Sequence, residues 1–165
     1  MICPSCGTEN IQGEDQCANC GADLRTVDIP QPSNTLEARL VAEPLSTLAA
    51  ADALTATPAT PAAEVLSLMR DNDAGSVVVE RDGRVVGIVT ELDALGLAGR
   101  PLDGLTAAQM MTADPVVLRA DDSIAVAIHK MAVGGFRHIP LVDGGRATRV
   151  VTARDVFRHI LEIID

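Results

Sequence analysis

The chain has 165 residues, of which 47% are hydrophobic, and a formal net charge of −10 at pH 7. This apolar fraction excludes a disordered chain and suits one domain, or a small domain joined to a moderate one. The acidic balance disfavours nucleic-acid binding, which needs Lys and Arg to displace counterions. The sequence shows no secretion signal and no run near the roughly 18 apolar residues of a membrane span, so we expect a cytoplasmic protein.

All four cysteines lie near the start, in two Cys-x-x-Cys-Gly runs, CPSCG and CANCG. Within each run the two sulfurs share one tight turn, and the following Gly can take the positive φ that such a turn needs. Two runs of this kind predict a zinc ribbon, whose closed site of four thiolates is structural and not catalytic. The predicted ligands are Cys3, Cys6, Cys17 and Cys20.

Two disulfides are the alternative, and the lack of a secretion signal and of any further cysteine argues against them. Zinc is favoured over iron, although thiolate ligation alone does not distinguish the two metals. Ribbons of this kind contact proteins or nucleic acids more often than they perform chemistry. Acidic residues such as Glu9, Asp15 and Asp23 favour a protein partner here.

A polar segment with two prolines, residues 26–35, follows the ribbon and predicts a linker. We therefore expect four segments along the chain. They are a ribbon at 1–25, a linker at 26–43, a first repeat at 44–100 and a second repeat at 101–165.

The rest of the chain repeats at an offset of 62 residues, which aligns Met69 with Met131 and Asp93 with Asp155 without a gap. Each copy predicts a helix, a strand, a Gly-containing hairpin turn, a second strand and a closing helix, the order βαββα. The predicted helices are 62–70 and 123–131, and the predicted strands are 76–79, 85–90, 138–142 and 147–152.

Two such units form an α+β fold in which they pack about a pseudo-twofold axis, with equivalent clefts between them that favour ligands. The closing helix of the second copy carries an apolar stripe that covers the sheet or forms a dimer contact, and core packing is favoured for most of its residues. The stripe consists of Val156, Phe157, Ile160, Leu161 and Ile164.

Four segments closely resemble a tandem pair of CBS domains, the module named after cystathionine β-synthase. They are GIVTELD (87–93), MMTADPVVL (110–118), FRHIPLVD (136–143) and RVVTARD (149–155). The resemblance covers residue 44 to the end and implies a regulatory fold whose cleft binds AMP, ADP or ATP, and sometimes S-adenosylmethionine. In the Thr-x-x-Asp motif of the family the Asp bonds the ribose hydroxyls and the Thr lies near the phosphate.

This motif falls on Thr90 and Asp93 in one repeat and on Thr152 and Asp155 in the other. A carboxylate in the first turn of a helix can accept a bond from each of two vicinal hydroxyls, and the helix amides favour an anion. Each Asp alone could equally be a helix N-terminal charge, and each Thr an N-cap. Their duplication at one offset favours a role in ligand binding.

The two predicted clefts differ in charge. The first combines Thr90, Asp93 and Thr112 with apolar Val77 and Val78, and the second combines Arg137, His138, Ile139, Pro140, Thr152, Arg154 and Asp155. Where the family has a small residue, Gly87 in the first repeat, the second repeat has Arg149. This side chain could block the cleft or supply a forked phosphate donor, and the sequence leaves both open.

The sequence contains no Ser-His-Asp order, no nucleophile elbow and no phosphate-cradling loop, so we expect no enzyme activity. His129 and His159 are interpreted as ordinary helix-surface histidines. The favoured hypothesis is a cytoplasmic sensor that binds an adenosine nucleotide, dimerises through its repeats and contacts a protein through the ribbon. The alternatives are a ligand-free dimeric scaffold and a regulator that contacts nucleic acid through the ribbon.

Overall fold

The computed structural model describes residues 2–10, 15–24 and 32–164. Parts of the predicted ribbon (residues 1, 11–14 and 25), most of the predicted polar linker (26–31) and residue 165 lie outside the described residues. The chain divides into two compact units. One holds residues 1–49, 121–137 and 153–165, and the other holds 50–120 and 138–152.

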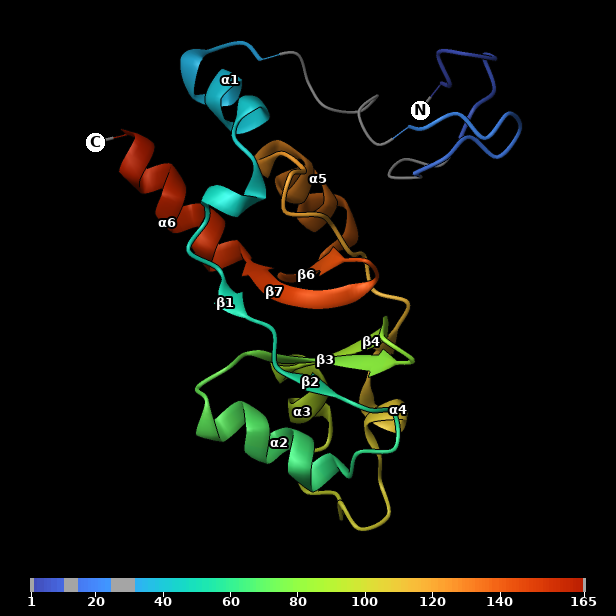
Figure 1. Ribbon diagram of the computed structural model, residues 1–165, viewed down its shortest axis with the longest axis vertical. Coiled ribbons are helices and arrows are strands. Elements are labelled where there is room, and N and C mark those ends of the chain that lie inside the picture. The colour runs from blue at the N-terminus through green and yellow to red at the C-terminus, as the bar shows by residue number, and fades with distance from the viewer. Residues whose placement is uncertain (1, 11–14, 25–31, 165) are drawn as a thin grey trace. The chain divides into compact units, whose positions relative to one another are not determined.

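The second of these units contains two β-sheets (Figure 1). The first sheet has the order β2 (Thr55–Ala56), β3 (Ser76–Arg81), β4 (Arg84–Thr90), β5 (Thr112–Ala113), and the second has the order β1 (Ala51–Asp52), β7 (Arg146–Thr152), β6 (His138–Asp143). A parallel bridge from Leu118 to Leu141 continues the second sheet beyond β6. Helices α2 (Ala62–Asp71), α3 (Glu91–Gly96) and α4 (Ala107–Met110) pack on the first sheet.

The other unit is helical. It contains α1 (Thr35–Ala42), a short 3₁₀ turn η1 (Leu45–Thr47), α5 (Ile124–Gly134) and α6 (Ala153–Ile164), besides the cysteine-rich segment. Helix α1 falls in the predicted linker, so residues 35–42 of that segment are helical. Asn34 caps this helix by accepting a bond from the Glu37 amide, and the helix buries Leu40, which gives the segment an apolar face that the Pro-rich part before it lacks.

The predicted repeat is confirmed down to the strand register. Val77 pairs with Val89 in the first hairpin, and Ile139 pairs with Val151 in the second, at an offset of 62. Both hairpins carry a bulge at the equivalent place. Both predicted hairpin turns also have two residues with positive φ, at 82–83 and 144–145, as a type I′ turn requires.

Each sheet takes its outer antiparallel strand from the start of the other repeat. Strand β5 pairs with β4 although it starts the second repeat, and β1 pairs with β7 although it starts the first. Backbone hydrogen bonds near the starts of the helices also join segments of different repeats. The Leu45 amide donates to the Asp122 carbonyl, and the equivalent Ala107 amide donates to the Thr60 carbonyl, both at 2.8 Å.

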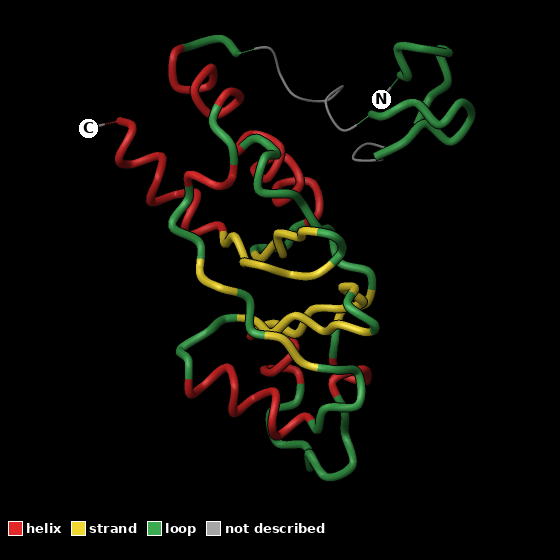
Figure 2. Tube along the Cα trace, in the orientation of Figure 1, coloured by secondary structure: helices red, strands yellow, loops and turns green. Residues whose placement is uncertain are grey.

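The two sheets stack with no helix between them (Figure 2). Val77 and Val89 belong to the core under the helices of the first sheet, whereas Val78 and Ile88 point to the opposite face by strand alternation and are also buried. The hairpins touch as well, since the Val85 amide donates to the Gly145 carbonyl at 3.0 Å. The sheets therefore share a buried apolar inner layer.

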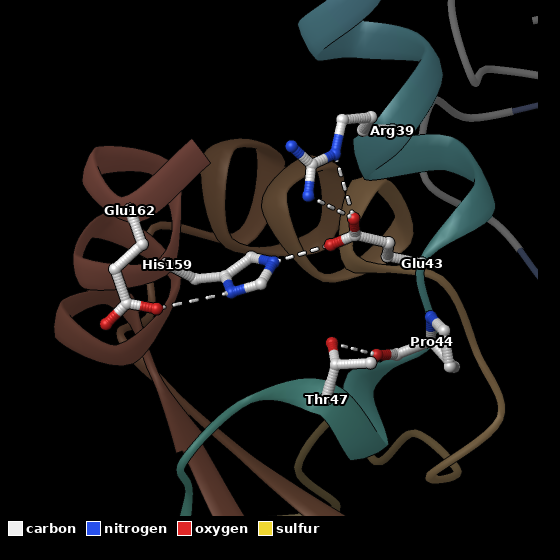
Figure 3. Close-up of polar contacts among 6 residues, drawn as sticks. All are labelled: Arg39, Glu43, Pro44, Thr47, His159 and Glu162. Carbon is white, nitrogen blue, oxygen red and sulfur yellow. Dashed lines mark hydrogen bonds and ion pairs between the residues drawn. The ribbon is translucent and has the colours of Figure 1, made fainter. Parts of the chain in front are cut away.

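A polar cluster joins α1 to α6 in the helical unit (Figure 3). The Glu43 carboxylate is bonded by His159 Nε2 at 2.6 Å and by the Arg39 guanidinium at 3.0 Å. His159 is therefore not an ordinary surface histidine, because its side chain is only 17% exposed. At the equivalent positions in the first repeat stand Leu105 and Leu97, which pack against the apolar core.

We expect Glu43→Leu alone to destabilise the protein by about 1–3 kcal/mol, because it leaves the half-buried His159 ring without its acceptor. The double variant Glu43→Leu, His159→Leu copies the apolar pair of the first repeat, and its free energy of unfolding should return to within about 1 kcal/mol of the wild type. Urea unfolding of both variants measures this. Additive losses in the double variant would contradict the interpretation of the two residues as a coupled pair.

The His159 hydrogen bond and the Arg39 guanidinium lower the pKa of Glu43 from its ordinary value of 4.5. A carboxyl whose pKa is lower in the folded state stabilises the fold above its unfolded pKa, and this contribution is lost as the pH falls through the folded value. Glu43→Gln should therefore lower the melting temperature at pH 7. The difference from wild type should shrink steadily below pH 4.5.

Measurement of both proteins side by side cancels other acid effects. Glu162→Gln is the matched control, because Glu162 is exposed and lies 4.0 Å from His159. It should change the melting temperature little at either pH. A difference between Glu43→Gln and wild type that is the same at pH 7 and pH 4 would show that the ionised carboxylate does not stabilise the fold.

Candidate functional site

The four cysteine sulfurs lie within 4.8 Å of one another, close enough to hold one metal ion. Cys3 Sγ is 3.7 Å from Cys20 Sγ, and Cys6 Sγ is 3.5 Å from Cys17 Sγ. Thiolates about 2.3 Å from a tetrahedral zinc ion would lie about 3.8 Å apart, whereas a disulfide needs about 2.05 Å. The donor set and its spacing therefore fit zinc, and none of the four forms a disulfide.

The two cysteine turns are copies of each other at an offset of 14 residues. The Gly7 amide donates to the Cys3 carbonyl and the Gly21 amide to the Cys17 carbonyl, both at 2.9 Å. These two glycines have φ near +70°, as the sequence predicted, and an added Cβ would be strained there. Each turn thus presents one buried and one exposed sulfur toward the same point.

Local hydrogen bonds favour the thiolate form at two of the cysteines. Bonds to the side chain and backbone of Thr8 lower the pKa of Cys6 to about 5. The backbone of Cys20 lowers the pKa of Cys17. The thiolate is the form that binds metal, so these bonds prepare Cys6 and Cys17 for a cation, whereas the neighbouring thiols raise the pKa of Cys20 to about 12.

Asn10 is a supporting residue that the sequence analysis missed. Its side-chain amide donates to the Thr8 carbonyl at 2.9 Å and lies 3.6 Å from Cys17 Sγ, and its oxygen accepts from the Ala18 amide at 2.9 Å. The buried Asn10 thereby links the two cysteine turns. The equivalent position in the second turn is Leu24, so the cysteine spacing alone gives no sign of this polar link.

The ribbon also contacts helix α5 in the helical unit. Asp15 forms an ion pair with Lys130, whose side chain is 7% exposed. A buried ammonium group is stable only with a partner, so the contact ties the ribbon to the second repeat.

We expect the purified native chain to contain one zinc ion per chain by elemental analysis, and Cys17→Ser to lose it. Asn10→Leu keeps all four ligands but removes their support, so its zinc affinity should fall by roughly 10- to 100-fold in competition with a chelator. Ser5→Ala, an exposed change within the first turn, is the control and should keep full affinity. Retention of one zinc ion by Cys17→Ser would contradict the four-cysteine site.

The first predicted ligand motif forms a capping box at the start of α3. Asp93 Oδ2 accepts from both the amide and the hydroxyl of Thr90, each at 2.7 Å. Within the described part of the chain, Asp93 Oδ1 has no hydrogen-bond partner. The box fixes the carboxylate and leaves one oxygen available to accept a ligand hydroxyl.

Residues of both repeats lie close to this turn. Thr112 is exposed on β5 and pairs in register with Ile88, two residues before Thr90. The His138 ring and the Glu91 carboxylate both approach Gly75, so closely that a Cβ on Gly75 would lie 2.8 Å from His138 Nε2. His138, which was predicted for the second cleft, therefore lies beside the first motif.

The second predicted group is divided between the two units of the chain. In the sheet unit, Thr152 pairs in register with His138. In the helical unit, the Ala153 amide donates to the Arg137 carbonyl at 3.0 Å, at the start of the helix that carries Arg154 and Asp155. Both arginines are exposed.

Several predicted ligand residues can offer only backbone atoms. The side chains of Val77, Val78, Ile139 and Pro140 are fully buried in the sheet unit. Any ligand contact by these residues would run through amides or carbonyls at the strand ends. The buried side chains of these strands therefore hold the Thr-x-x-Asp motif in place and do not line a pocket.

The repeats differ in side-chain size at Gly87 and its equivalent Arg149, and the structure shows which side chain lies beside Gly87. Met111 lies against Gly87 so closely that a Cβ there would meet Met111 Sδ at 2.2 Å. Gly87 shares its sheet face with the core residue Val89, so its small size makes room for Met111. In the second repeat Arg149 replaces Gly87, and the residue equivalent to Met111 is Ala49.

A separate open pocket of about 410 Å³ lies at the hairpin turns of the sheet unit. None of the residues predicted to bind ligand lines it. The lining consists of Arg84, Val85, Asp114, Pro115, Val117, Val142, Gly144 and Gly145.

Comparison with known proteins agrees with the duplicated fold. The sequence matches the family described as "CBS domain" twice, over residues 45–99 and 107–162. The chain belongs to the CBS domain family. Its strand exchange and paired hairpins are therefore those of a CBS pair, which here follows an N-terminal cluster of four cysteines.

A solved structure of CBSX2 in complex with AMP is 22% identical, with a TM-score of 0.64, and the match covers 74% of this chain and 98% of that one. The CBS pair of protein MJ0100, solved with 5′-methylthioadenosine and S-adenosyl-L-methionine, is 19% identical with a TM-score of 0.67, over 73% of this chain and 98% of that one. At these identities the likeness establishes the fold alone.

An uncharacterized 17.7 kDa protein of Acidianus ambivalens is 34% identical over 104 residues, which are 61% of this chain and 63% of that protein. The chain spans less than two thirds of the length of the curated relatives it matches. None of these three proteins is described by a catalytic activity. None of the helices in the described residues is both long and apolar enough to cross a membrane.

Proposed function

We propose that this chain is a non-catalytic sensor in which the CBS pair binds an adenosine-containing ligand and the zinc ribbon contacts a protein partner. The observation that carries the proposal is the capping box of Thr90 and Asp93, which holds a carboxylate with one oxygen available. The same motif recurs at Thr152 and Asp155, at the equivalent strand end.

The chemistry of this turn suits a ribose. Vicinal hydroxyls donate to a carboxylate, and Asp93 is already oriented by two bonds from Thr90, so the loss of side-chain entropy on binding is small. The amides at the start of a helix favour a phosphate. The solved CBS pairs with AMP and with S-adenosyl-L-methionine support an adenosine ligand, although they share less than 25% identity with this chain.

His138 makes the two repeats unequal in the proposed site. Its equivalent in the first repeat is Ser76, which is buried, whereas the His138 ring approaches Glu91 and Gly75 beside the first motif. An imidazole can donate to a phosphate. We propose that phosphate recognition in this unit depends mainly on His138 of the second repeat.

The ribbon provides the output of the sensor. Its contact through Asp15 and Lys130 ties it to α5 of the second repeat. A ligand that shifts the packing of that repeat would also change the ribbon's preferred position, because the coupling between two sites is reciprocal. The acidic surface of the ribbon favours a basic protein surface as its partner.

Isothermal titration with AMP, ADP, ATP and S-adenosylmethionine tests the first step. We expect at least one of these ligands to bind, and Asp93→Asn or Asp155→Asn to weaken it by roughly 10- to 100-fold, because an amide cannot replace both charged acceptor bonds. Asp114→Asn is the matched control. It neutralises an exposed carboxylate in the hairpin-turn pocket, outside the motif.

Each outcome separates the proposal from its rivals. An absence of heat with all four ligands would overturn nucleotide sensing and favour the ligand-free scaffold. If Asp114→Asn abolishes binding while the motif variants do not, the ligand occupies the hairpin-turn pocket, and the assigned site is wrong. Salt-dependent binding of RNA or DNA to the native chain would instead favour contact with nucleic acid.

A further inference from the structure

The hairpin-turn pocket of the sheet unit contains two opposite charges. Arg84 and Asp114 both line it, and both side chains are exposed. Within the described part of the chain, neither charged group forms an ion pair or a hydrogen bond, with each other or with a further residue. A guanidinium and a carboxylate that share a pocket in this way can each bind a different group of one ligand.

Residues 114–117 cross from one sheet to the other and form one part of the pocket wall. At the start of the crossing the Asp114 amide donates to the Val86 carbonyl of β4 at 3.1 Å, and just after it the Leu118 amide donates to the Pro140 carbonyl of β6 at 3.1 Å. Both ends of the crossing are therefore fixed by backbone bonds. A wall that is held in place before binding costs a ligand little ordering entropy.

The two hairpin turns contribute the rest of the wall. The Val85 amide donates to the Gly145 carbonyl at 3.0 Å, and the Arg84 stem lies so close to Gly145 that a Cβ there would meet Arg84 Cγ at 3.2 Å. The turns thus hold the first part of the Arg84 side chain. Val85 and Val142 are half-buried and Val117 is 37% exposed, so the pocket also offers apolar surface.

The internal repeat shows what is particular to this pocket. Both charges recur at the offset of 62, as Arg146 and Asp52, and neither of these residues lines the pocket. In place of Val142 the first repeat has Glu80, whose carboxylate accepts the Ala147 amide at 2.7 Å. The equivalent place therefore holds a fixed negative charge, which would repel the carboxylate of a ligand.

We propose that the hairpin-turn pocket binds a free α-amino acid with an apolar side chain. The Arg84 guanidinium matches a carboxylate in a forked geometry, and the Asp114 carboxylate accepts from an ammonium group. A phosphate ester would satisfy Arg84 alone and place its charge beside Asp114. The volume of about 410 Å³ lies within the range of small-molecule sites, about 300–1,000 Å³.

Solvent exposure limits the affinity. Arg84 and Asp114 are both in contact with water, so each charged bond replaces hydration and gains little net free energy. Burial of the ligand's apolar side chain on the valines adds to binding. We expect a dissociation constant of about 0.1–1 mM for L-leucine.

Amide correlation spectra of the full chain, titrated with L-leucine up to about 10 mM, test the site. The amide signals of Val85 and Gly145 should shift as the pocket fills. L-leucinamide lacks the carboxylate and isocaproate lacks the ammonium group, so each should bind at least about tenfold more weakly than L-leucine.

Each charge has its own variant. Arg84→Gln should weaken the binding of L-leucine and isocaproate at least about tenfold and leave that of L-leucinamide unchanged. Asp114→Asn should weaken L-leucine and L-leucinamide and leave isocaproate unchanged. Arg146→Gln and Asp52→Asn are the matched controls, because they change the repeat equivalents outside the pocket, and both should bind L-leucine like the native protein.

The absence of any shift with L-leucine, or an equal loss of binding in the two control variants, would overturn the proposal. Equal affinities for isocaproate and L-leucine would contradict the role of Asp114. Loss of L-leucine binding in Asp93→Asn but not in Arg84→Gln would place the amino acid at the Thr-x-x-Asp motif and reject this pocket. The site is independent of the proposed adenosine site, so Arg84→Gln should leave the binding of AMP unchanged.

Discussion

The exchange of segments between the repeats is the constraint on which the rest of the fold depends. A single βαββα unit leaves one sheet face open and one sheet edge unpaired, and both are costly for an isolated unit of about sixty residues. Here one edge of each hairpin is paired with a strand from the start of the other repeat, and each inner face is covered by the other sheet. Neither repeat is therefore complete without the other.

At equivalent positions of this shared fold, the contacts between helices are apolar in one case and polar in the other. Leu97 and Leu105 form an apolar contact in the first repeat, and Glu43 and His159 form a hydrogen-bonded pair at the equivalent place. The polar pair adds a condition that the apolar pair lacks, since it requires an ionised carboxylate. The helical unit therefore contains a contact that weakens as the pH falls.

The repeat, the turns and the cysteine cluster could be predicted from sequence because each has a local cause. A residue with positive φ or a pair of nearby sulfurs is set by neighbours along the chain. The strand exchange could not be predicted, because β1 and β5 are two residues long and their partners are distant in sequence. The strand propensity of two residues is too little to predict where such a strand lies or what it pairs with.

The same distinction holds within the candidate sites. The Thr90 and Asp93 box follows from a three-residue spacing, so the sequence analysis found it. The approach of His138 to Gly75, the Met111 side chain over Gly87 and the link through Asn10 depend on contacts between segments far apart in sequence. Gly87 shows the difference clearly, since a small residue expected to leave room for a ligand leaves room for a methionine.

Lys130 connects these observations to the ribbon. Its equivalent in the first repeat is Leu68, an apolar residue packed against the core. In the second repeat a cation therefore occupies a position that is apolar in the first. Such a cation is costly unless a carboxylate meets it, and Asp15 of the ribbon does so. Displacement of the ribbon would remove this carboxylate from a buried ammonium group. The position of the ribbon and the stability of α5 are therefore coupled through this ion pair.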